Sequence, residues 1–386
     1  MSSNDAVIVS AVRTPVGIGK PVKGVLSGIH PVDLSAIVLN SVTSRVGLDP
    51  ALVDDVIWGA VSQVGEQSGN IARNAVLAAG FPEDVTGVSI DRQCGSSQQA
   101  VTFAAAGVIA GHYDIVIAGG VESMSRVPMM SNMVGGDGPY SQSMQDRYDG
   151  GLVLQGISAE LIAAKWNLSR TYLDELAATS QQRAAAARAA GLFDAEIVPV
   201  ETTDGVVSQD QGIRPDTTVE SLSTLKTPFK EDGVVTAGNA SQISDGSAAL
   251  LIMSSARAAE LGLTPLARIH TVALAGVDPI YMLTGPIPAT ERVLKRSGLA
   301  LSDIGAFEVN EAFASVLGAW YAETGASPAL TNINGGAIAL GHPLGGSGAR
   351  LMTTLVHQMQ RSGAKYGLQT MCEGGGMANA TILELL

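Results

Sequence analysis

The feature that most constrains this chain is an internal repeat with a period of about 251 residues. The segment GLDPALVDDVIWGAV (47–61) has a counterpart in GLALSDIGAFEVNEAF (298–313): each begins with Gly-Leu and continues through a short spacer to an aspartate and an apolar run. The apolar run at 267–277 likewise resembles the run at 6–12. A period this long indicates duplication of a whole folded unit and not a short-period solenoid. We therefore expect two similar halves that pack together, an arrangement that often forms a binding site between them.

Both halves alternate short apolar runs with helical stretches, a pattern typical of α/β folds. In the first half the predicted strands are 6–12, 54–61, 85–90 and 114–120, and the predicted helices are 34–47, 70–80 and 96–111. In the second half the predicted strands are 267–277, the apolar part of 298–313, 330–334 and 366–376, and the predicted helices are 289–297, 313–325 and 347–361. Several of these helices are apolar nearly all round, which favours burial between layers of the fold.

Residues 122–248 have no counterpart in the second half. Helical stretches are predicted there at 158–166 and 171–190, and most of the clustered cations of the middle chain lie in the same segment: Lys165, Arg170, Arg183, Arg188, Arg214, Lys226 and Lys230. A long insertion on a rigid scaffold is a usual place for substrate contacts. The alternative interpretation is a solvated, variable decoration of the surface.

Charge and cysteine content exclude several classes of protein. The chain has 23 Lys and Arg against 36 Asp and Glu, a formal net charge of −13 without a basic block, so a nucleic-acid groove is not expected. Two cysteines are too few for a secreted disulfide scaffold and favour a reducing compartment. No apolar run approaches the roughly 18–20 residues of a membrane span. With neither a signal peptide nor a peroxisomal tripeptide recognisable, we expect a cytoplasmic protein.

Cys94 lies in IDRQCGSSQQAV (90–101), where a predicted strand ends, the chain turns and a helix begins. A thiol at the start of a helix faces unpaired N–H groups and the positive end of the helix dipole, and both lower its pKa. This setting predicts a nucleophilic cysteine. The alternative is a small, buried, apolar cysteine, which is the commoner role of a lone Cys.

His342 lies in NGGAIALGHPLGGSGAR (334–350), where glycines allow close approach of the backbone and Pro343 favours an extended conformation before it. The other four histidines occupy ordinary helix-end or strand positions. The glycine-rich stretch contains neither G-x-x-x-x-G-K-[ST] nor G-x-G-x-x-G, so nucleotide binding through those motifs is disfavoured.

Two further segments carry chemistry near predicted strand ends. Cys372 begins CEGGGMANA, in which three glycines place bare N–H groups beside a thiol as a candidate oxyanion site; the alternative is a turn with an incidental cysteine. Asn310 and Glu311 lie at a strand-to-helix junction, where Asn is also well suited to be a helix N-cap. The Cys and His spacing matches no zinc motif, so no metal site is expected.

RQCGSS, VNEAFA, GGAIALGHPLGGSGAR and CEGGGMA, in this order over the whole chain, resemble the motifs of the thiolase family, as do VRTPVG near the start and TAGNASQISDGSAA (236–249). The resemblance implies the thiolase fold, in which two βαβαβαββ halves form a five-layer α/β/α/β/α core with an inserted loop domain. It implies an N-terminal half at 1–121 plus 249–270, the loop domain at 122–248 and a C-terminal half at 271–386. It also implies an acyltransferase acting on coenzyme A thioesters.

Catalytic roles follow from the same resemblance, residue by residue. Cys94 is implied to be the nucleophile that becomes acylated, with His342 taking its proton. Cys372 is implied to be the general acid and base. Asn310, through an ordered water, and His342 would hold the enolate oxygen, while the backbone N–H groups of Cys94 and Gly374 would hold the oxyanion of the tetrahedral intermediate.

The resemblance also implies a binding site for coenzyme A as co-substrate, with no metal and no tightly bound cofactor. Arg214 would contact the nucleotide end, and Phe229, Ala237 and Ser241 belong to the same loop domain, with the segment around Ser241 lining the pantetheine tunnel. Thiolases are usually dimers or tetramers, so a homodimer or homotetramer is expected.

One departure from the family pattern concerns substrate choice. Short-chain thiolases specific for acetoacetyl-CoA often have His-Met where this chain has Leu154 and Gln155, in LQGISAE (154–160). The CEGGGMANA segment also resembles degradative members more than biosynthetic ones. We therefore expect a degradative 3-ketoacyl-CoA thiolase of fatty acid or lipid β-oxidation. The alternatives are a biosynthetic acetyl-CoA acetyltransferase and a non-catalytic subunit that binds acyl-CoA or lipid.

Overall fold

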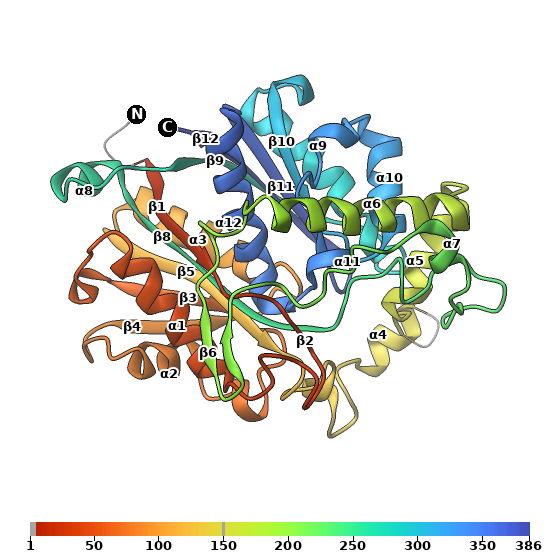
Figure 1. Ribbon diagram of the computed structural model, residues 1–386, viewed down its shortest axis with the longest axis horizontal. Helices are drawn as coiled ribbons and strands as arrows, with labels where there is room; N and C mark the ends of the chain where they lie inside the picture. Colours follow the sequence, from red (N-terminus) through yellow and green to blue (C-terminus); the bar gives the residue numbers. More distant parts are fainter. Residues whose placement is uncertain (1–4, 149–150) are drawn as a thin grey trace.

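The structure, a computed structural model, describes residues 5–148 and 151–386. In these residues the strands form one ten-stranded mixed sheet in the order β10-β11-β12-β9-β1-β8-β5-β3-β4, with the short β2 paired to β8. Figure 1 shows the strands of the C-terminal part beside those of the N-terminal part, with helices packed around both. The α/β fold predicted from the alternating pattern is confirmed.

The strands of the sheet, in chain order, are β1 (Ala6–Arg13), β2 (Gly17–Ile18), β3 (Asp55–Gly59), β4 (Thr86–Ile90), β5 (Ile115–Ser123), β8 (Ser244–Ser254), β9 (Ala267–Gly276), β10 (Ile304–Val309), β11 (Tyr366–Glu373) and β12 (Met377–Leu385). The helices of the two halves are α1 (Pro31–Ser44), α2 (Ile71–Ala78), α3 (Ser96–Ala110), α8 (Ser255–Glu260), α9 (Pro286–Ser297), α10 (Ala314–Thr324), α11 (Ala337–Leu340) and α12 (Leu344–Ser362). Short 3₁₀ turns lie at 50–52, 65–67, 131–133, 282–284, 301–303 and 328–330.

The sheet repeats its own topology, as the sequence repeat predicts. In the first half β1 pairs antiparallel with β8, β8 antiparallel with β5, and β5 parallel with β3. In the second half β9 pairs antiparallel with β12, β12 antiparallel with β11, and β11 parallel with β10. The halves join through β1 and β9, which pair only at Val7–Arg268 and Ile8–Ala267.

The repeat is incomplete at one edge, where the strand predicted at 330–334 is wrong. In its place the structure has a 3₁₀ turn at Pro328–Leu330 and a single bridge between Thr331 and Phe307. Asn332 has a positive φ of 48°, which breaks the extended conformation, and its side-chain amide donates to and accepts from the backbone of Val309 at 2.8 Å each way. A side chain thus makes the hydrogen bonds that a strand ladder would have made.

The buried clusters show the layers of the fold. One apolar core lies between α1, α2 and one face of the first half of the sheet, and another lies between α9, α10 and the outer face of the second half. Between the two halves, α3 and α12 pack against each other and against strands of both. Both helices end at a glycine in the left-handed conformation, Gly111 and Gly363, as helix C-termini commonly do. This gives the five layers expected for the fold.

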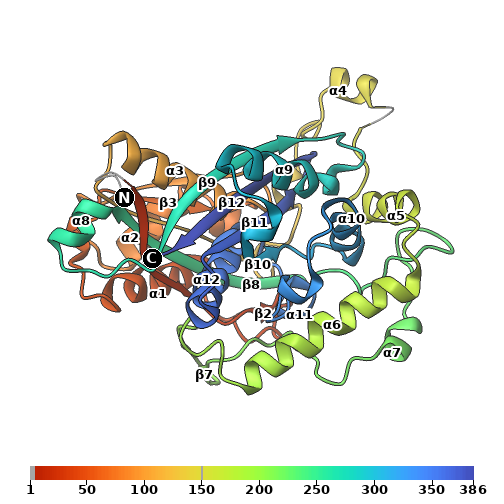
Figure 2. The same cartoon turned by 90° about the horizontal axis from the view of Figure 1, so that it is seen from above.

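The insertion lies between the end of β5 and the start of β8. Its elements are α4 (Gln142–Arg147), α5 (Gln155–Lys165), α6 (Arg170–Ala189), a two-stranded hairpin of β6 (Val200–Thr202) and β7 (Gly205–Val207), and α7 (Val219–Ser223). Figures 1 and 2 show α5, α6 and α7 on one side of the molecule, next to the second half. The exact domain boundaries proposed from the sequence stay predictions.

Among the described helices, none combines the length and the apolar character needed to cross a bilayer.

Candidate active site

Cys94 is buried in the tight turn between β4 and α3. Gln93 has a positive φ of 49°, and Ser96 closes the turn because its Oγ accepts from the Arg92 N–H at 2.9 Å and donates to the Gln93 carbonyl at 2.6 Å. The helix begins at Ser96 without a side-chain cap. The predicted strand–turn–helix setting is therefore present, and the start of α3 is free of a competing side-chain acceptor at its N-cap.

His342 is buried just before α12, and two contacts fix its ring. Nδ1 lies 2.6 Å from the Ser347 Oγ, and Nε2 lies 3.3 Å from the Asn310 Nδ2. The Ser347 hydroxyl donates its proton to the Pro343 carbonyl at 2.8 Å, so it accepts from Nδ1–H. This assigns the proton of a neutral ring to Nδ1 and leaves Nε2 as the acceptor on the site side.

Asn310 connects His342 to the edge where β10 and β11 end. Its backbone N–H donates to the Thr370 carbonyl at 3.1 Å, two residues before Cys372. Its Oδ1 is buried and has no hydrogen-bond partner among the described residues. The N-cap interpretation of Asn310 is wrong, because α10 begins at Ala314 with Phe313 in the N-cap position.

Cys372 is fully buried in β11 and lies within electrostatic range of Cys94. The backbone N–H groups of Cys94 itself and of Gly374 both act on the Cys94 sulfur as hydrogen-bond donors. The first turns of α3 and α12 are also joined, since the Ala349 N–H donates to the Ser97 Oγ at 2.9 Å. The structure therefore brings Cys94 and Cys372 together, links His342 to Asn310, and joins the segments that carry the two pairs. A single site built from all four residues, and the role of each, stay predictions.

Burial sets the protonation of these groups. It raises the pKa of Cys94 to about 12, with the nearby Glu373 carboxylate adding to the effect, so the lowered pKa expected from the helix start is wrong for this environment. Burial, and then the proximity of Cys94, raises the pKa of Cys372 as well. Burial, and then the charge of Arg350, lowers the pKa of His342 to about 3. The site holds two thiols and a neutral imidazole, so a thiolate forms only by passing its proton to a base.

Two buried glutamates, Glu122 and Glu311, hold the loops of the site, and the sequence patterns singled out only Glu311, together with Asn310. The Glu122 carboxylate, at the end of β5, accepts from the backbone N–H groups of Val61, Ser62 and Gly345 at 3.0, 3.1 and 2.9 Å. It thereby ties the first half to the loop that carries His342. A charged residue near the end of an apolar strand was the only available signal for Glu122.

The second supporting glutamate, Glu311, follows Asn310. It accepts from the Ser180 Oγ at 2.6 Å, from the Asn332 Nδ2 at 3.0 Å and from the Ile338 N–H at 3.2 Å. These contacts fasten α6 of the insertion to the second half, close to the start of α11. Glu311 therefore acts as a structural tie between the insertion and the loop that leads to His342.

The residues predicted for coenzyme A occupy the insertion and its return to β8. Phe229 is half-buried, stacks edge-on against Phe313 with ring centroids 6.2 Å apart, and packs on Gly156 of α5. The Ser241 N–H donates to the Ala312 carbonyl at 2.9 Å. Both therefore adjoin the segment that follows Asn310.

Arg214 and Ala237 are the other two residues predicted to bind coenzyme A, and both are exposed. The backbone N–H of Arg214 donates to the Gln181 Oε1 at 2.7 Å. This hydrogen bond does not involve the guanidinium group. The binding role of all four residues stays a prediction.

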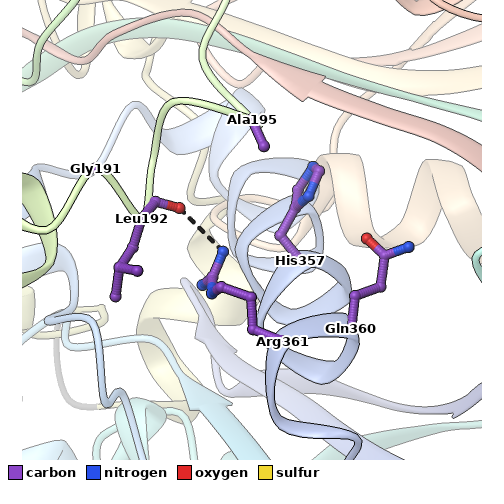
Figure 3. A pocket seen from close by; sticks show the side chains of 6 residues that line it. All are labelled: Gly191, Leu192, Ala195, His357, Gln360 and Arg361. Atoms are coloured by element: carbon purple, nitrogen blue, oxygen red, sulfur yellow. Dashed lines mark hydrogen bonds between the residues drawn. The ribbon is translucent and has the colours of Figure 1, made fainter.

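A hollow on the molecule lies away from the predicted catalytic residues. A hollow of about 300 Å³, shown in Figure 3, lies where α12 meets the chain after α6, and its lining residues are Gly191, Leu192, Ala195, His357, Gln360 and Arg361. Arg361 already donates to the Leu192 carbonyl at 3.0 Å, and none of the predicted catalytic residues lines the hollow. Within residues 5–148 and 151–386, no cluster of three or more His, Cys, Asp and Glu side chains is arranged to hold a metal ion.

Comparison with known proteins agrees with the fold. The model described as "Thiolase, N-terminal domain" matches residues 6–256, and that described as "Thiolase, C-terminal domain" matches residues 263–385. The chain is 50% identical to the steroid 3-ketoacyl-CoA thiolase FadA6 of Mycobacterium tuberculosis, over 99% of this chain and 94% of that protein. It is 44% identical to the 3-ketoacyl-CoA thiolase of Bacillus subtilis, over 99% of both chains.

A solved structure gives the same result. The crystal structure of the Bacillus anthracis acetyl-CoA acetyltransferase superposes with a TM-score of 0.90 at 39% identity and covers 99% of both chains. A duplicated α/β fold with two thiols and a neutral imidazole between its halves, matched over its whole length, defines an acyltransferase. The chain belongs to the thiolase family, which confirms the resemblance seen in its motifs.

Proposed function

We propose that this chain is a degradative thiolase that uses coenzyme A to cleave a 3-ketoacyl-CoA into acetyl-CoA and an acyl-CoA shortened by the same two carbons. The observation that supports the proposal is the proximity of Cys94 to Cys372, together with the contact between His342 and Asn310. The names of the relatives from M. tuberculosis and B. subtilis support the same direction of reaction and the 3-ketoacyl-CoA substrate.

In the first half-reaction, the Cys94 thiol passes its proton to His342 as the sulfur attacks the 3-keto carbon. The oxyanion that forms is stabilised by the backbone N–H groups of Cys94 and Gly374, which already converge on the sulfur. Its collapse breaks the bond between the 2- and 3-carbons. The acetyl-CoA enolate leaves, with its oxygen facing His342 and a water held by Asn310, and takes a proton at carbon from Cys372. The shortened acyl group stays on Cys94.

In the second half-reaction, Cys372 takes the thiol proton of incoming coenzyme A, and the resulting sulfur anion attacks the acyl group on Cys94. The tetrahedral intermediate uses the same two backbone N–H groups. Its collapse releases the shortened acyl-CoA, and Cys94 regains the proton that His342 had accepted. Removal of one oxyanion donor typically costs about 10²–10³ in rate, so the placement of Gly374 matters to both half-reactions.

Coenzyme A is a co-substrate in this proposal and is not tightly bound. Its pantetheine chain would pass the segment around Ser241 and the ring of Phe229, both of which adjoin the stretch that follows Asn310. Arg214, which is exposed, would meet the phosphates of the nucleotide end, and Ala237 would border the tunnel. In a chain of net charge −13, a local cation is needed to hold an anionic co-substrate.

We also propose that the chain forms a homodimer or a dimer of dimers. The β10 edge of the sheet is covered by the segment 328–332, whereas the opposite edge strand β4 is partly exposed, with Val88 42% exposed. An uncovered edge strand is a ready template for pairing with another chain. Light scattering on the purified chain tests this proposal, and a monomer at micromolar concentration contradicts it.

We propose the reducing cytoplasm as the compartment of this protein, because both cysteines are free.

The second candidate function is biosynthetic: condensation of two acetyl-CoA molecules to acetoacetyl-CoA. The structural similarity to a protein named acetyl-CoA acetyltransferase favours it. Leu154 and Gln155, in place of His-Met at the start of α5, disfavour it. A non-catalytic acyl-CoA-binding role is disfavoured because a pure binder needs neither two thiols nor a base.

A panel of 3-ketoacyl-CoA substrates separates these functions. With coenzyme A present, we expect kcat/KM for release of acetyl-CoA to be at least about tenfold higher for chains longer than four carbons than for acetoacetyl-CoA. The reason is the added apolar contact of the longer chain, since about 1.4 kcal/mol corresponds to a factor of ten. A preference for acetoacetyl-CoA would support the biosynthetic function. Absence of CoA-dependent cleavage for every substrate would support the non-catalytic role.

A further inference from the structure

Glu373 is a buried carboxyl group beside the site to which the mechanism assigns no step. It directly follows Cys372 in β11, and because successive side chains of a strand point to opposite faces, it faces away from the Cys372 thiol. Its side chain is 0% exposed, and neither carboxyl oxygen has a hydrogen-bond partner among the described residues. A buried carboxyl without a donor is costly when ionised, so its presence calls for an explanation.

The Glu373 carboxyl lies against the residue that follows the nucleophile. A Cβ atom placed on Gly95 would lie 2.0 Å from the Glu373 Oε1 and 2.8 Å from the Asn379 Nδ2. The Asn379 Nδ2 also donates to the Gly95 carbonyl at 3.1 Å. The carboxyl and the amide thus hold the start of α3 between them, where the unpaired N–H groups of the helix also lie.

The charges around Glu373 are few. The Arg92 Nη1 lies 4.0 Å from its Oε2, and Asp91 is the other charged group that acts on it. A charge on Glu373 raises the pKa of both the Cys94 and the Cys372 thiols. Burial raises the pKa of Glu373 to about 8, with Arg92 opposing and Asp91 reinforcing the shift. A negative charge at this position makes a thiolate at Cys94 less favourable.

We propose that Glu373 is a positioning residue that controls how readily Cys94 loses its proton: in its neutral form it permits the thiolate, and as a carboxylate it opposes it. The inference rests on the proposed function only in that Cys94 is the nucleophile. Its sign is fixed by the charges. Below about pH 8 the Glu373 carboxyl is neutral and does not raise the pKa of Cys94. Above about pH 8 it ionises, and its negative charge makes the Cys94 thiolate less favourable.

The test is alkylation of Cys94 by iodoacetamide as a function of pH, followed by peptide mapping so that Cys94 and Cys372 are scored separately. In the wild-type chain, the rate should rise with pH and then rise less steeply above about pH 8. Glu373→Gln keeps the shape of the neutral acid. It should match the wild-type rate below pH 8 and exceed it above, by up to about tenfold, the factor that corresponds to one pKa unit.

Two controls make this result specific. Glu384→Gln removes the same charge at the opposite end of the β11–β12 hairpin and should leave the Cys94 profile unchanged. Arg92→Gln removes the cation nearest to Glu373 and should move the wild-type break to higher pH, because the neutral acid is then favoured. Arg92 is partly exposed, so this variant tests the inference even where Glu373→Gln fails to fold.

A ratio of Glu373→Gln to wild-type rates that stays constant across the pH range overturns the inference, as does an unmoved break in Arg92→Gln. Neither result bears on whether Cys94 is acylated by acyl-CoA. Conversely, if acyl-CoA does not acylate Cys94, the proposed function is overturned. The pH profile of Cys94 alkylation still measures the effect of Glu373 in that case. The two failures are therefore distinguishable.

Discussion

Cys94, Cys372 and His342 show that burial outweighs the start of a helix in setting protonation. The N–H groups of Cys94 and Gly374 do favour the thiolate, but removal of the sulfur from water raises its pKa to about 12. The same desolvation keeps His342 neutral. A resting site without a buried ion pair avoids the desolvation cost of two charges, and the proton moves only as charge develops on the substrate. The motifs predicted that these residues share a site, but their burial depends on elements hundreds of residues away.

The depressed pKa of His342 predicts a pH-dependent contribution to stability. In the unfolded chain this histidine binds a proton near its ordinary value of 6.5, whereas in the native protein its pKa is about 3. Between these values the unfolded state binds more protons, so stability is lost as pH falls. Relative to His342→Gln, the free energy of unfolding of the wild-type chain should fall by about 2 kcal/mol between pH 7 and pH 5. Urea unfolding at both pH values measures this difference.

The control for this measurement is His112→Gln, which replaces an exposed histidine and corrects for the loss of one ionisable side chain. If the difference between the wild-type chain and His342→Gln stays the same at both pH values, then His342 is not held neutral by burial, and the tautomer assigned from Ser347 loses its support.

At the scale of elements, the repeat explains what could be predicted and where prediction failed. Strands such as β1 and β9 and helices such as α3 and α12 are long, apolar segments, and their predicted ranges agree with the structure to within a few residues. The strand predicted at 330–334 is absent because the side-chain amide of Asn332 makes the hydrogen bonds to Val309 that a strand ladder would have made. A side-chain contact of this kind leaves no periodic pattern in the sequence. The contacts of Glu122 and Glu373 were missed for the same reason, since both are made between distant segments.

The position of His342 depends on a close contact between β5 and the start of α12, where glycines allow the two backbones to approach. A Cβ on Gly120 would lie 2.2 Å from the Gly345 carbonyl oxygen and 2.6 Å from that of Gly59, and both are backbone atoms. We expect Gly120→Ala to displace the start of α12, to cost about 1–3 kcal/mol in the free energy of unfolding, and to lower kcat by about 100-fold because His342 moves with it. Urea unfolding and acetyl-CoA release measure the two effects.

Gly28 provides the matched control, because a Cβ there meets no atom within 4 Å. Gly28→Ala should change the unfolding free energy by no more than about 0.5 kcal/mol and leave turnover intact. Wild-type kcat in a stably folded Gly120→Ala would show that close packing at this contact does not position the histidine.

At the scale of the whole molecule, the duplication brings together residues that the chain keeps far apart. Cys94 comes from the first half, and Asn310, His342 and Cys372 come from the second, so neither half contains a complete site. The period of the repeat predicted that two halves would pack together, and the motifs marked the segments that meet. The geometry of their meeting depends on how α3 and α12 pack between the two parts of the sheet, which no local pattern encodes.

The most direct test of this account is the mass of the intact chain and of its Cys94 peptide after mixing with acetyl-CoA in the absence of a second substrate. The wild-type chain and Cys372→Ala should each gain one acetyl group on Cys94, and Cys94→Ala should gain none. On adding substrate and coenzyme A, only the wild-type chain should turn over. An acetyl group elsewhere, or near-wild-type turnover in both cysteine variants, would contradict a single acyl-transfer site built from the two halves.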